Sequence, residues 1–165
     1  MHSSAIVTHA LRSQKIQGDP YLKVRLTSQV VAALGMRYVQ EALVLPMRQL
    51  TPMPNKPACL LGLTNRRGQV VWAVDLARVL GLGMLPANLQ QHNVTIVQVG
   101  KMLLALAVHQ VEEIIWLQPE VIQPAPGQVA PDLLPYLQGC WVQSQQVGLV
   151  LDIAAIAQSH TLHRD

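Results

Sequence analysis

LLGLTNRRGQVVWAVDLARVL, at residues 60–80, and LQGCWVQSQQVGLVLDIAAIA, at residues 137–157, share one order of glycines, apolar runs and acidic residues. The corresponding positions lie 77 residues apart, as they do for Gly62 with Gly139 and for Asp75 with Asp152. Two segments with the same succession of turns and apolar runs indicate two copies of one supersecondary unit.

The repeat extends upstream with a different offset. VVAALGMRYVQE at residues 30–41 corresponds to MLLALAVHQVEE at residues 102–113, and TPMP at 51–54 corresponds to QPAP at 123–126; both pairs lie 72 residues apart. About five residues have therefore entered the second copy between its proline-rich turn and its glycine. Two copies are too few for an open solenoid, so the repeat predicts a duplicated fold.

Length and composition indicate a globular chain. Its 165 residues suit one domain or two small units with a common core, and 50% apolar with only 13% charged residues argues against disorder outside the ends. The N-terminus lacks the long apolar stretch of a signal peptide, and the uncharged stretch 133–151 contains a proline and several glutamines. We therefore expect a cytoplasmic protein, with Cys59 and Cys140 as buried, reduced thiols.

Charge is divided unevenly along the chain. Residues 1–67 hold nine Lys and Arg against two acids, whereas residues 68–165 hold three against seven acids, within a net charge of +3. Such a division suggests that one half meets an acidic partner, although a solvated basic face would give the same pattern.

The local patterns predict mostly short strands. Alternating or continuously apolar runs of this length fit strands of a sheet that is buried on one or both faces. On this basis we expect strands at residues 21–26, 30–34, 63–66, 70–74, 94–99, 103–108, 136–142 and 147–151. The helical spacing of Met36, Val39 and Leu43 predicts a short helix over 36–43, and one helical turn is expected at 58–61.

Each copy ends in the same way. Asp75 precedes LARVLGLG and is expected to cap the N-terminus of a helix that stops at Gly81, and Asp152 repeats that role before a C-terminal helix to about Ser159. About five short strands and a terminal helix per copy are typical of a small barrel, which hides its edges by closing.

No set of catalytic residues is apparent. The chain has no Walker A loop, no complete dinucleotide loop and no nucleophile elbow, and the adjacent Glu112 and Glu113 project differently. The spacing of His160 and His163 could seat a metal ion, but no third ligand is near in the sequence. We expect neither a cofactor nor a metal, and an enzyme of an unrecognised kind is disfavoured.

The sharpest local signal is Asn65-Arg66-Arg67-Gly68, at the predicted turn between the strands 63–66 and 70–74. Two arginines at a hairpin tip project from the fold and can make bidentate contacts, although a merely soluble turn would look the same. A small nucleic-acid-binding barrel is the alternative function. Such a protein usually has aromatic residues among the basic ones, on which bases can stack, whereas aromatic residues make up only 4% of this chain.

These residues resemble the CheW family of chemotaxis coupling proteins. The family's hallmark of a glycine, a strand, Asn-x-Arg-Gly, an apolar strand and Asp-Leu stands here as GLTNRRGQVVWAVDL, at residues 62–76. The likeness continues through VQE at 39–41, IQPAP at 122–126, YLQG at 136–139 and LVLDI at 149–153, and covers about residues 20–158.

The resemblance implies a mainly β fold of two pseudo-symmetric five-stranded SH3-like barrels that share an apolar core, with short helices. The expected organisation is an N-terminal arm at 1–19, a CheW-like domain at 20–158 and a tail at 159–165. Within the domain we expect a first barrel at about 20–90, a second at about 91–151 and the C-terminal helix at 152–158.

The resemblance also implies a non-catalytic adaptor without cofactors. Its partners would be the regulatory domain of a CheA-type histidine kinase and the cytoplasmic tip of a methyl-accepting chemoreceptor, with no nucleic acid and no insertion into the membrane. By position, Asn65, Arg67 and Gly68 fall in the motif whose arginine supports coupling, and Val39 and Gly62 fall on the kinase-facing surface. With Arg66, these are the candidate partner-binding residues.

Four positions depart from the family pattern. The residue before Arg67 is usually apolar and is Arg66 here, and the usual proline of the following strand is Ala73. His109-Gln110 replaces a common Asp-Gly, and Ala42 replaces an isoleucine. These departures suggest a divergent member that serves a pilus-motility or phototaxis array instead of flagella. A separate alternative to the adaptor role is a stand-alone inhibitor or a competitor of coupling.

Overall fold

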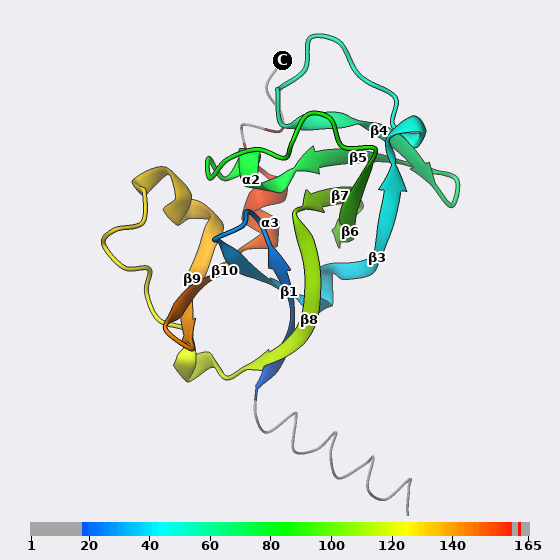
Figure 1. Ribbon diagram of the computed structural model, residues 1–165. Helices are drawn as coiled ribbons and strands as arrows, with labels where there is room; N and C mark the ends of the chain where they lie inside the picture. Colours follow the sequence, from blue (N-terminus) through cyan, green and yellow to red (C-terminus); the bar gives the residue numbers. More distant parts are fainter. Residues whose placement is uncertain (1–17, 160–161, 163–165) are drawn as a thin grey trace, which may run out of the picture.

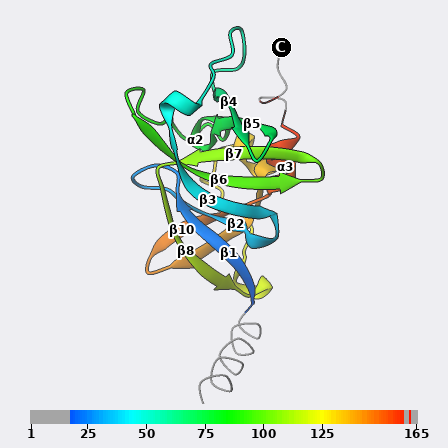
Figure 2. The same cartoon turned by 90° about the vertical axis from the view of Figure 1, so that its right-hand side faces the viewer.

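The computed structural model describes residues 18–159 and Leu162. Two five-stranded sheets make up most of the fold and are stacked along the length of the molecule (Figures 1 and 2). The β1 sheet has the order β8 (Gln110–Leu117), β1 (Asp19–Arg25), β2 (Val31–Gly35), β10 (Gln146–Leu151) and β9 (Leu137–Gln143). The β6 sheet has the order β3 (Val39–Pro46), β6 (Gln91–Val99), β7 (Met102–Val108), β5 (Gln69–Asp75) and β4 (Leu60–Arg66).

The expected duplication is present, and the copies exchange strands. The first copy supplies β1 to β5 and the second supplies β6 to β10, in the same order and at the offsets found in the sequence. The β1 sheet takes β1 and β2 from the first copy and β8, β9 and β10 from the second, whereas the β6 sheet has the reciprocal composition. The sheets therefore do not follow the expected division into a barrel at about 20–90 and another at about 91–151.

Two parallel strand pairs tie the copies together. In the β6 sheet, Trp72–Asp75 of β5 pairs with Leu104–Ala107 of β7, and in the β1 sheet Gly148–Val150 of β10 pairs with Val31–Ala33 of β2. All other pairs between strands are antiparallel. A parallel pair needs a long connection, and here the chain between β5 and β7 includes β6, while the chain between β2 and β10 includes strands of both copies.

A two-residue bridge closes each barrel. Thr51 and Leu63 exchange backbone hydrogen bonds of 2.8 and 2.9 Å, so that the segment after β3 returns to β4 at the opposite edge of the β6 sheet. Gln123 and Cys140 do the same for β8 and β9 with two bonds of 2.8 Å. The repeated TPMP and QPAP motifs therefore mark the places where the open edges are covered.

The core runs between the two sheets. One cluster of buried side chains joins Leu22 and Leu34 of the β1 sheet with Val74 and Leu106 of the β6 sheet and with Ile156 of α3 (Ile153–Ala157). Smaller clusters fill the interior of each barrel. Cys59 and Cys140 are buried thiols, and burial raises the pKa of both.

The two aspartates cap helices as predicted. The Asp75 carboxylate accepts a hydrogen bond from the N–H of Arg78 at 3.4 Å, at the start of α2 (Leu76–Val79), and also from the N–H of Leu85 at 2.8 Å. The Asp152 carboxylate accepts from the N–H of Ala155 at 3.0 Å, at the start of α3. Among the described residues, neither of these nor any other helix is long and apolar enough to cross a membrane.

Three local predictions were wrong. Residues 36–43 form a 3-10 turn, η1 (Met36–Tyr38), followed by the strand β3, because Glu41, Leu43 and Leu45 alternate toward the barrel interior. Of the helical turn expected at 58–61, residues 58 and 59 lie in a turn closed by a hydrogen bond from the N–H of Leu60 to the Pro57 oxygen, and β4 begins at Leu60; the strand β8 was not predicted. The expected N-terminal arm lies outside the described residues, apart from its last two positions.

The interiors of the two barrels differ at one cross-strand pair. Thr64 pairs with Val71 in the β6 sheet, and the equivalent pair in the β1 sheet is Trp141 with Gly148. A Cβ atom on Gly148 would lie 2.3 Å from the Cη2 atom of the Trp141 ring. The second barrel is thus filled by one large ring that leaves no room for a side chain opposite.

We expect Gly148→Ala to destabilise the protein by about 1–3 kcal/mol, because a well-packed core tolerates an added methyl group poorly. Urea unfolding of the single variants and of Gly148→Ala/Trp141→Phe measures the effect. The smaller ring should recover part of the loss, so the two substitutions should not be additive. Gly127→Ala is the control, since a Cβ there meets nothing within 4 Å. Equal losses at the two glycines would contradict the packing described.

The strand exchange predicts how the chain behaves when it is cut. Fragments 1–87 and 88–165, divided at an exposed loop, should each fail to fold alone, since each lacks partners for its strands in both sheets. Mixed or co-expressed, the fragments should assemble into one folded complex with the dispersed amide NMR spectrum of the intact chain. A dispersed spectrum from either fragment alone would show that the copies fold as independent barrels.

Candidate partner-binding surface

The hairpin between β4 and β5 turns at its predicted residues. Arg67 and Gly68 both have positive φ, at 54° and 80°, which suits the two-residue turns that match the twist of a hairpin. The Asn65 side-chain oxygen accepts a hydrogen bond from the N–H of Gly68 at 3.1 Å. We call residues Asn65–Gly68 the hairpin tip; Asn65 and Gly68 hold its shape.

Arg66 is held by an acid from another strand. Its Nε and Nη2 atoms donate to the two carboxylate oxygens of Glu41 at 2.6 and 2.7 Å, a bidentate pair. Glu41 lies on β3 and Arg66 on β4, the two edge strands of the β6 sheet. The pair therefore links the open edges at the mouth of the barrel and adds to the backbone bridge at Thr51.

Arg67 is largely exposed and only marginally paired with Glu41. Its side chain is 82% exposed, and its Nη2 atom lies 4.0 Å from the nearer Glu41 oxygen. The two arginines of the motif are thus divided in role, because Arg66 is bound within the fold while the guanidinium of Arg67 stands in solvent on a turn of fixed shape. Figure 1 shows this hairpin projecting from the β6 sheet.

The ion pair shifts the proton affinities of both partners. The hydrogen bonds from Arg66 hold the pKa of the Glu41 carboxyl below its ordinary value, with smaller help from the charges of Arg66 and Arg67. In return, the hydrogen bond to Glu41 raises the pKa of the Arg66 guanidinium. At neutral pH the pair is fully charged, and much of the charge of Arg66 is neutralised at the hairpin tip.

The other two candidate residues do not lie at the tip. Val39 is half-buried at the start of β3 and packs against the main core. Gly62 is buried with φ 152°, and a Cβ atom there would lie 2.8 Å from the Thr51 oxygen. Barrel closure accounts for the glycine at position 62, while a contact of either residue with a kinase stays a prediction.

Glu41 is the residue that the site prediction missed. It appears in the sequence as the last residue of VQE, 25 positions before Arg66. The signal available was an unusual arginine at position 66 together with an acid in a chain that has few acids. The spacing alone does not indicate that Glu41 and Arg66 are in contact, because the contact depends on β3 and β4 meeting at the mouth of the barrel.

Metal-binding groups do not gather in the part of the chain that the structure describes. Across residues 18–159 and Leu162, no three His, Cys, Asp or Glu side chains lie close enough to hold an ion. His160 and His163, whose spacing was considered above, lie outside the described residues.

A family model described as CheW-like domain matches residues 20–161, which is most of the chain. The chain belongs to the CheW-like family. This is a family of non-catalytic scaffold proteins, so membership agrees with the absence of a catalytic motif from the sequence. It also agrees with the two five-stranded sheets of the fold.

Two relatives of the chain are CheW proteins of Rhizobium species. The chain is 39% identical over 84 residues to a probable chemotaxis protein CheW of Rhizobium etli, and 36% identical over 76 residues to the chemotaxis protein CheW of Rhizobium meliloti. These matches span 50% and 46% of this chain, and 52% and 48% of the relatives. The chain thus spans about half the length of the curated relatives it matches.

A solved structure has the same fold. The scaffolding protein TtCheW of Thermoanaerobacter tengcongensis superposes with a TM-score of 0.73, over 87% of this chain and 95% of that one, at 19% sequence identity. At that identity the likeness is one of fold, and it extends over both barrels.

We expect Arg66→Gln to return the pKa of the Glu41 carboxyl toward its ordinary value, as followed by carbon-detected NMR titration. Because the folded pKa is depressed, the pair stabilises the fold at pH above the unfolded carboxyl value and ceases to do so as pH falls through the folded pKa. In the variant, unfolding stability should therefore depend less on pH in that acidic window. Arg67→Gln is the matched control and should shift Glu41 far less, since its guanidinium is 4.0 Å away. Equal shifts in the two variants would refute the division of roles.

Proposed function

We propose that this protein is a non-catalytic adaptor of a chemotaxis-type pathway, coupling methyl-accepting receptors to a CheA-type histidine kinase. Its family relation supports a scaffold in chemotaxis signalling. The receptor tip and the regulatory domain of the kinase are the partners proposed, and the protein acts in the cytoplasm beside receptor arrays.

The observation that carries the proposal is the display of Arg67. A hairpin tip stiffened by the Asn65 hydrogen bond and by the Arg66–Glu41 pair presents one exposed guanidinium to solvent. Because the turn that carries Arg67 is already held in shape, its backbone loses little freedom on binding, and the guanidinium can donate two hydrogen bonds to a carboxylate of a partner. Arg66 supports that contact by fixing the hairpin to β3.

An exposed apolar side chain follows the tip. Val70, two residues beyond it on β5, is 63% exposed, and Val44 on β3 of the same sheet is 49% exposed. Exposed arginine beside small apolar residues suits a modest interface of the transient signalling kind, which buries less than about 1,200 Å². Such contacts form and dissociate readily, as coupling between a receptor and a kinase requires.

The nucleic-acid alternative has lost support. Three of the nine basic residues of the first half are closely paired within the described part of the chain, since Arg66 is bound to Glu41, and Arg25 and Lys23 lie 2.8 and 3.4 Å from the carboxylate oxygens of Glu112. Paired cations release few counterions from a nucleic acid, so these three should add little salt-dependent affinity. A gel shift with a steep salt dependence would favour that alternative over the adaptor.

The pathway is proposed to be pilus motility or phototaxis rather than flagellar chemotaxis. Support comes from the departures from the family pattern, of which Arg66 now has a structural account in its pairing with Glu41. Affinity capture from a lysate of the native host, with identification of the co-purifying kinases and receptors, decides between the pathways.

We expect Arg67→Glu to leave the fold intact and to abolish capture of the kinase or the receptor in pull-down assays. Reversing an exposed charge disturbs no core contact, whereas an acid at this position repels a carboxylate of the partner. Arg48→Glu, at another exposed arginine in the 3-10 turn Met47–Gln49, is the matched control and should bind as the wild type does. Unchanged capture by the Arg67 variant would remove the tip from the site, and no capture by the wild type would count against the adaptor itself.

A further inference from the structure

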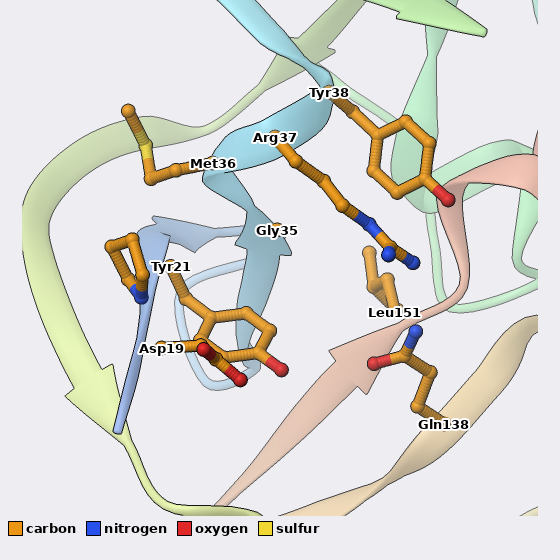
Figure 3. Close-up of a pocket in the computed structure, with 9 residues that line it drawn as sticks. Asp19, Tyr21, Gly35, Met36, Arg37, Tyr38, Gln138 and Leu151 are labelled. Carbon is orange, nitrogen blue, oxygen red and sulfur yellow. The ribbon is translucent and has the colours of Figure 1, made fainter. Parts of the chain in front are cut away.

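A cavity of about 430 Å³ opens beside β1, remote from the hairpin tip. It lies where the start of β1, the turn η1 and the strands β9 and β10 meet, and Figure 3 shows the side chains that line it. This volume falls within the range of roughly 300–1,000 Å³ that is typical of small-molecule sites.

One end of the cavity is cationic. The Arg37 guanidinium lies 4.8 Å from the centre of the Tyr38 ring, and Figure 3 shows it directed across the cavity toward the Gln138 amide. No carboxylate in the described part of the chain lies within 4.0 Å of this guanidinium. Its stacking on the ring orients the group without neutralising it.

The opposite end is anionic. Asp19 lies beside the ring of Tyr21 in Figure 3, on the side away from Arg37. Burial raises the pKa of the Tyr21 hydroxyl, the charge of Asp19 raises it further, and the charge of Arg37 lowers it. Both charged groups therefore act on the hydroxyl that lies between them, yet they do not form an ion pair with each other.

Apolar groups join the two ends. Pro20 and Leu151 line the cavity together with the rings of Tyr21 and Tyr38. The hydroxyls of these tyrosines and the Gln138 amide are additional donors. The cavity thus has a cation with hydrogen-bond donors at one end, an apolar middle, and a carboxylate at the other end.

We propose that this cavity binds a small zwitterion, a free amino acid or a dipeptide, with its carboxylate on Arg37 and its ammonium group on Asp19. A ligand with several acidic groups would meet repulsion from Asp19, and a simple cation would leave the Arg37 guanidinium without a counter-charge. A molecule with one charge of each sign satisfies both groups at once, and its side chain covers the apolar middle. The site goes beyond the adaptor function, since it uses neither of the arginines at the hairpin tip.

The test is an amide NMR titration of the full chain with leucine and with glycyl-leucine, up to about 10 mM, a range that detects millimolar affinity. We expect saturable shifts at Gly35, Arg37, Tyr38 and Gln138. The N-acetyl derivative and the C-terminal amide of each probe should bind more weakly, because each lacks one of the two charges. Tighter binding of leucine or of glycyl-leucine, which differ in the separation of their two charges, distinguishes a free amino acid from a dipeptide as the ligand.

Arg37→Gln should weaken binding of the parent probes at least about tenfold, as loss of a charge-assisted hydrogen bond implies. Asp19→Asn should weaken it about two- to fivefold, as for an exposed ion pair, and should leave the N-acetyl derivative unaffected. Arg48→Gln is the matched control outside the cavity and should bind as the wild type does. Both cavity variants alter exposed groups, so an unchanged pattern of amide shifts elsewhere verifies their fold.

Three results would overturn the proposal. The first is the absence of saturable shifts with every probe. The second is binding that survives Arg37→Gln. The third is equal binding of the N-acetyl derivative, which would show a carboxylate-only ligand such as the C-terminus of a polypeptide.

Discussion

The parallel pairing of the last strand of each copy with the second strand of the other copy is the constraint on which this fold depends. Once β5 lies beside β7 and β10 beside β2, each sheet must contain strands from both copies. The apolar faces of the two sheets then meet across one core, into which the helices α2 and α3 also pack. The bridges at Thr51 and Gln123 join the edge strands of each sheet and so close the barrels. Gly62 and Gly139 leave room for the backbone that forms these bridges.

Cations on this framework fall into two groups. The first group donates hydrogen bonds to carboxylates of other strands and so links strands within the fold, as Arg66 does with Glu41 and Arg25 with Glu112. Arg67 and Arg37 stand on turns, at the ends of strands. Among the described residues, Arg67 lies no nearer than 4.0 Å to a carboxylate, and Arg37 contacts the Tyr38 ring instead of an acid. Recognition of other molecules is to be sought at this second group.

The sequence was sufficient for the features that depend on neighbouring residues. The Asn65 turn, the aspartate caps and most strands follow from local chemistry, and the two offsets of the repeat match the strand boundaries of both copies. The exchange of strands could not be read from it, because a strand has the same alternation whichever copy it pairs with. A helix was predicted over 36–43 because Met36, Val39 and Leu43 lie at helical spacing. The alternation of the strand β3 is obscured there, because VQEALVLP is apolar at positions of both parities. Glu41 and the cavity at Arg37 depend on contacts between distant segments, which periodicity does not reveal.

The reciprocal make-up of the sheets also affects how the molecule fails. A substitution that destabilises one strand weakens a sheet to which both copies of the repeat contribute. Because the two sheets share one core, the other sheet is destabilised as well. A half-melted form, with one barrel intact and still able to hold a binding partner, therefore has no stable basis. A cell would contain whole copies and unfolded copies, and no crippled intermediate that occupies one side of a signalling assembly while leaving the other side empty.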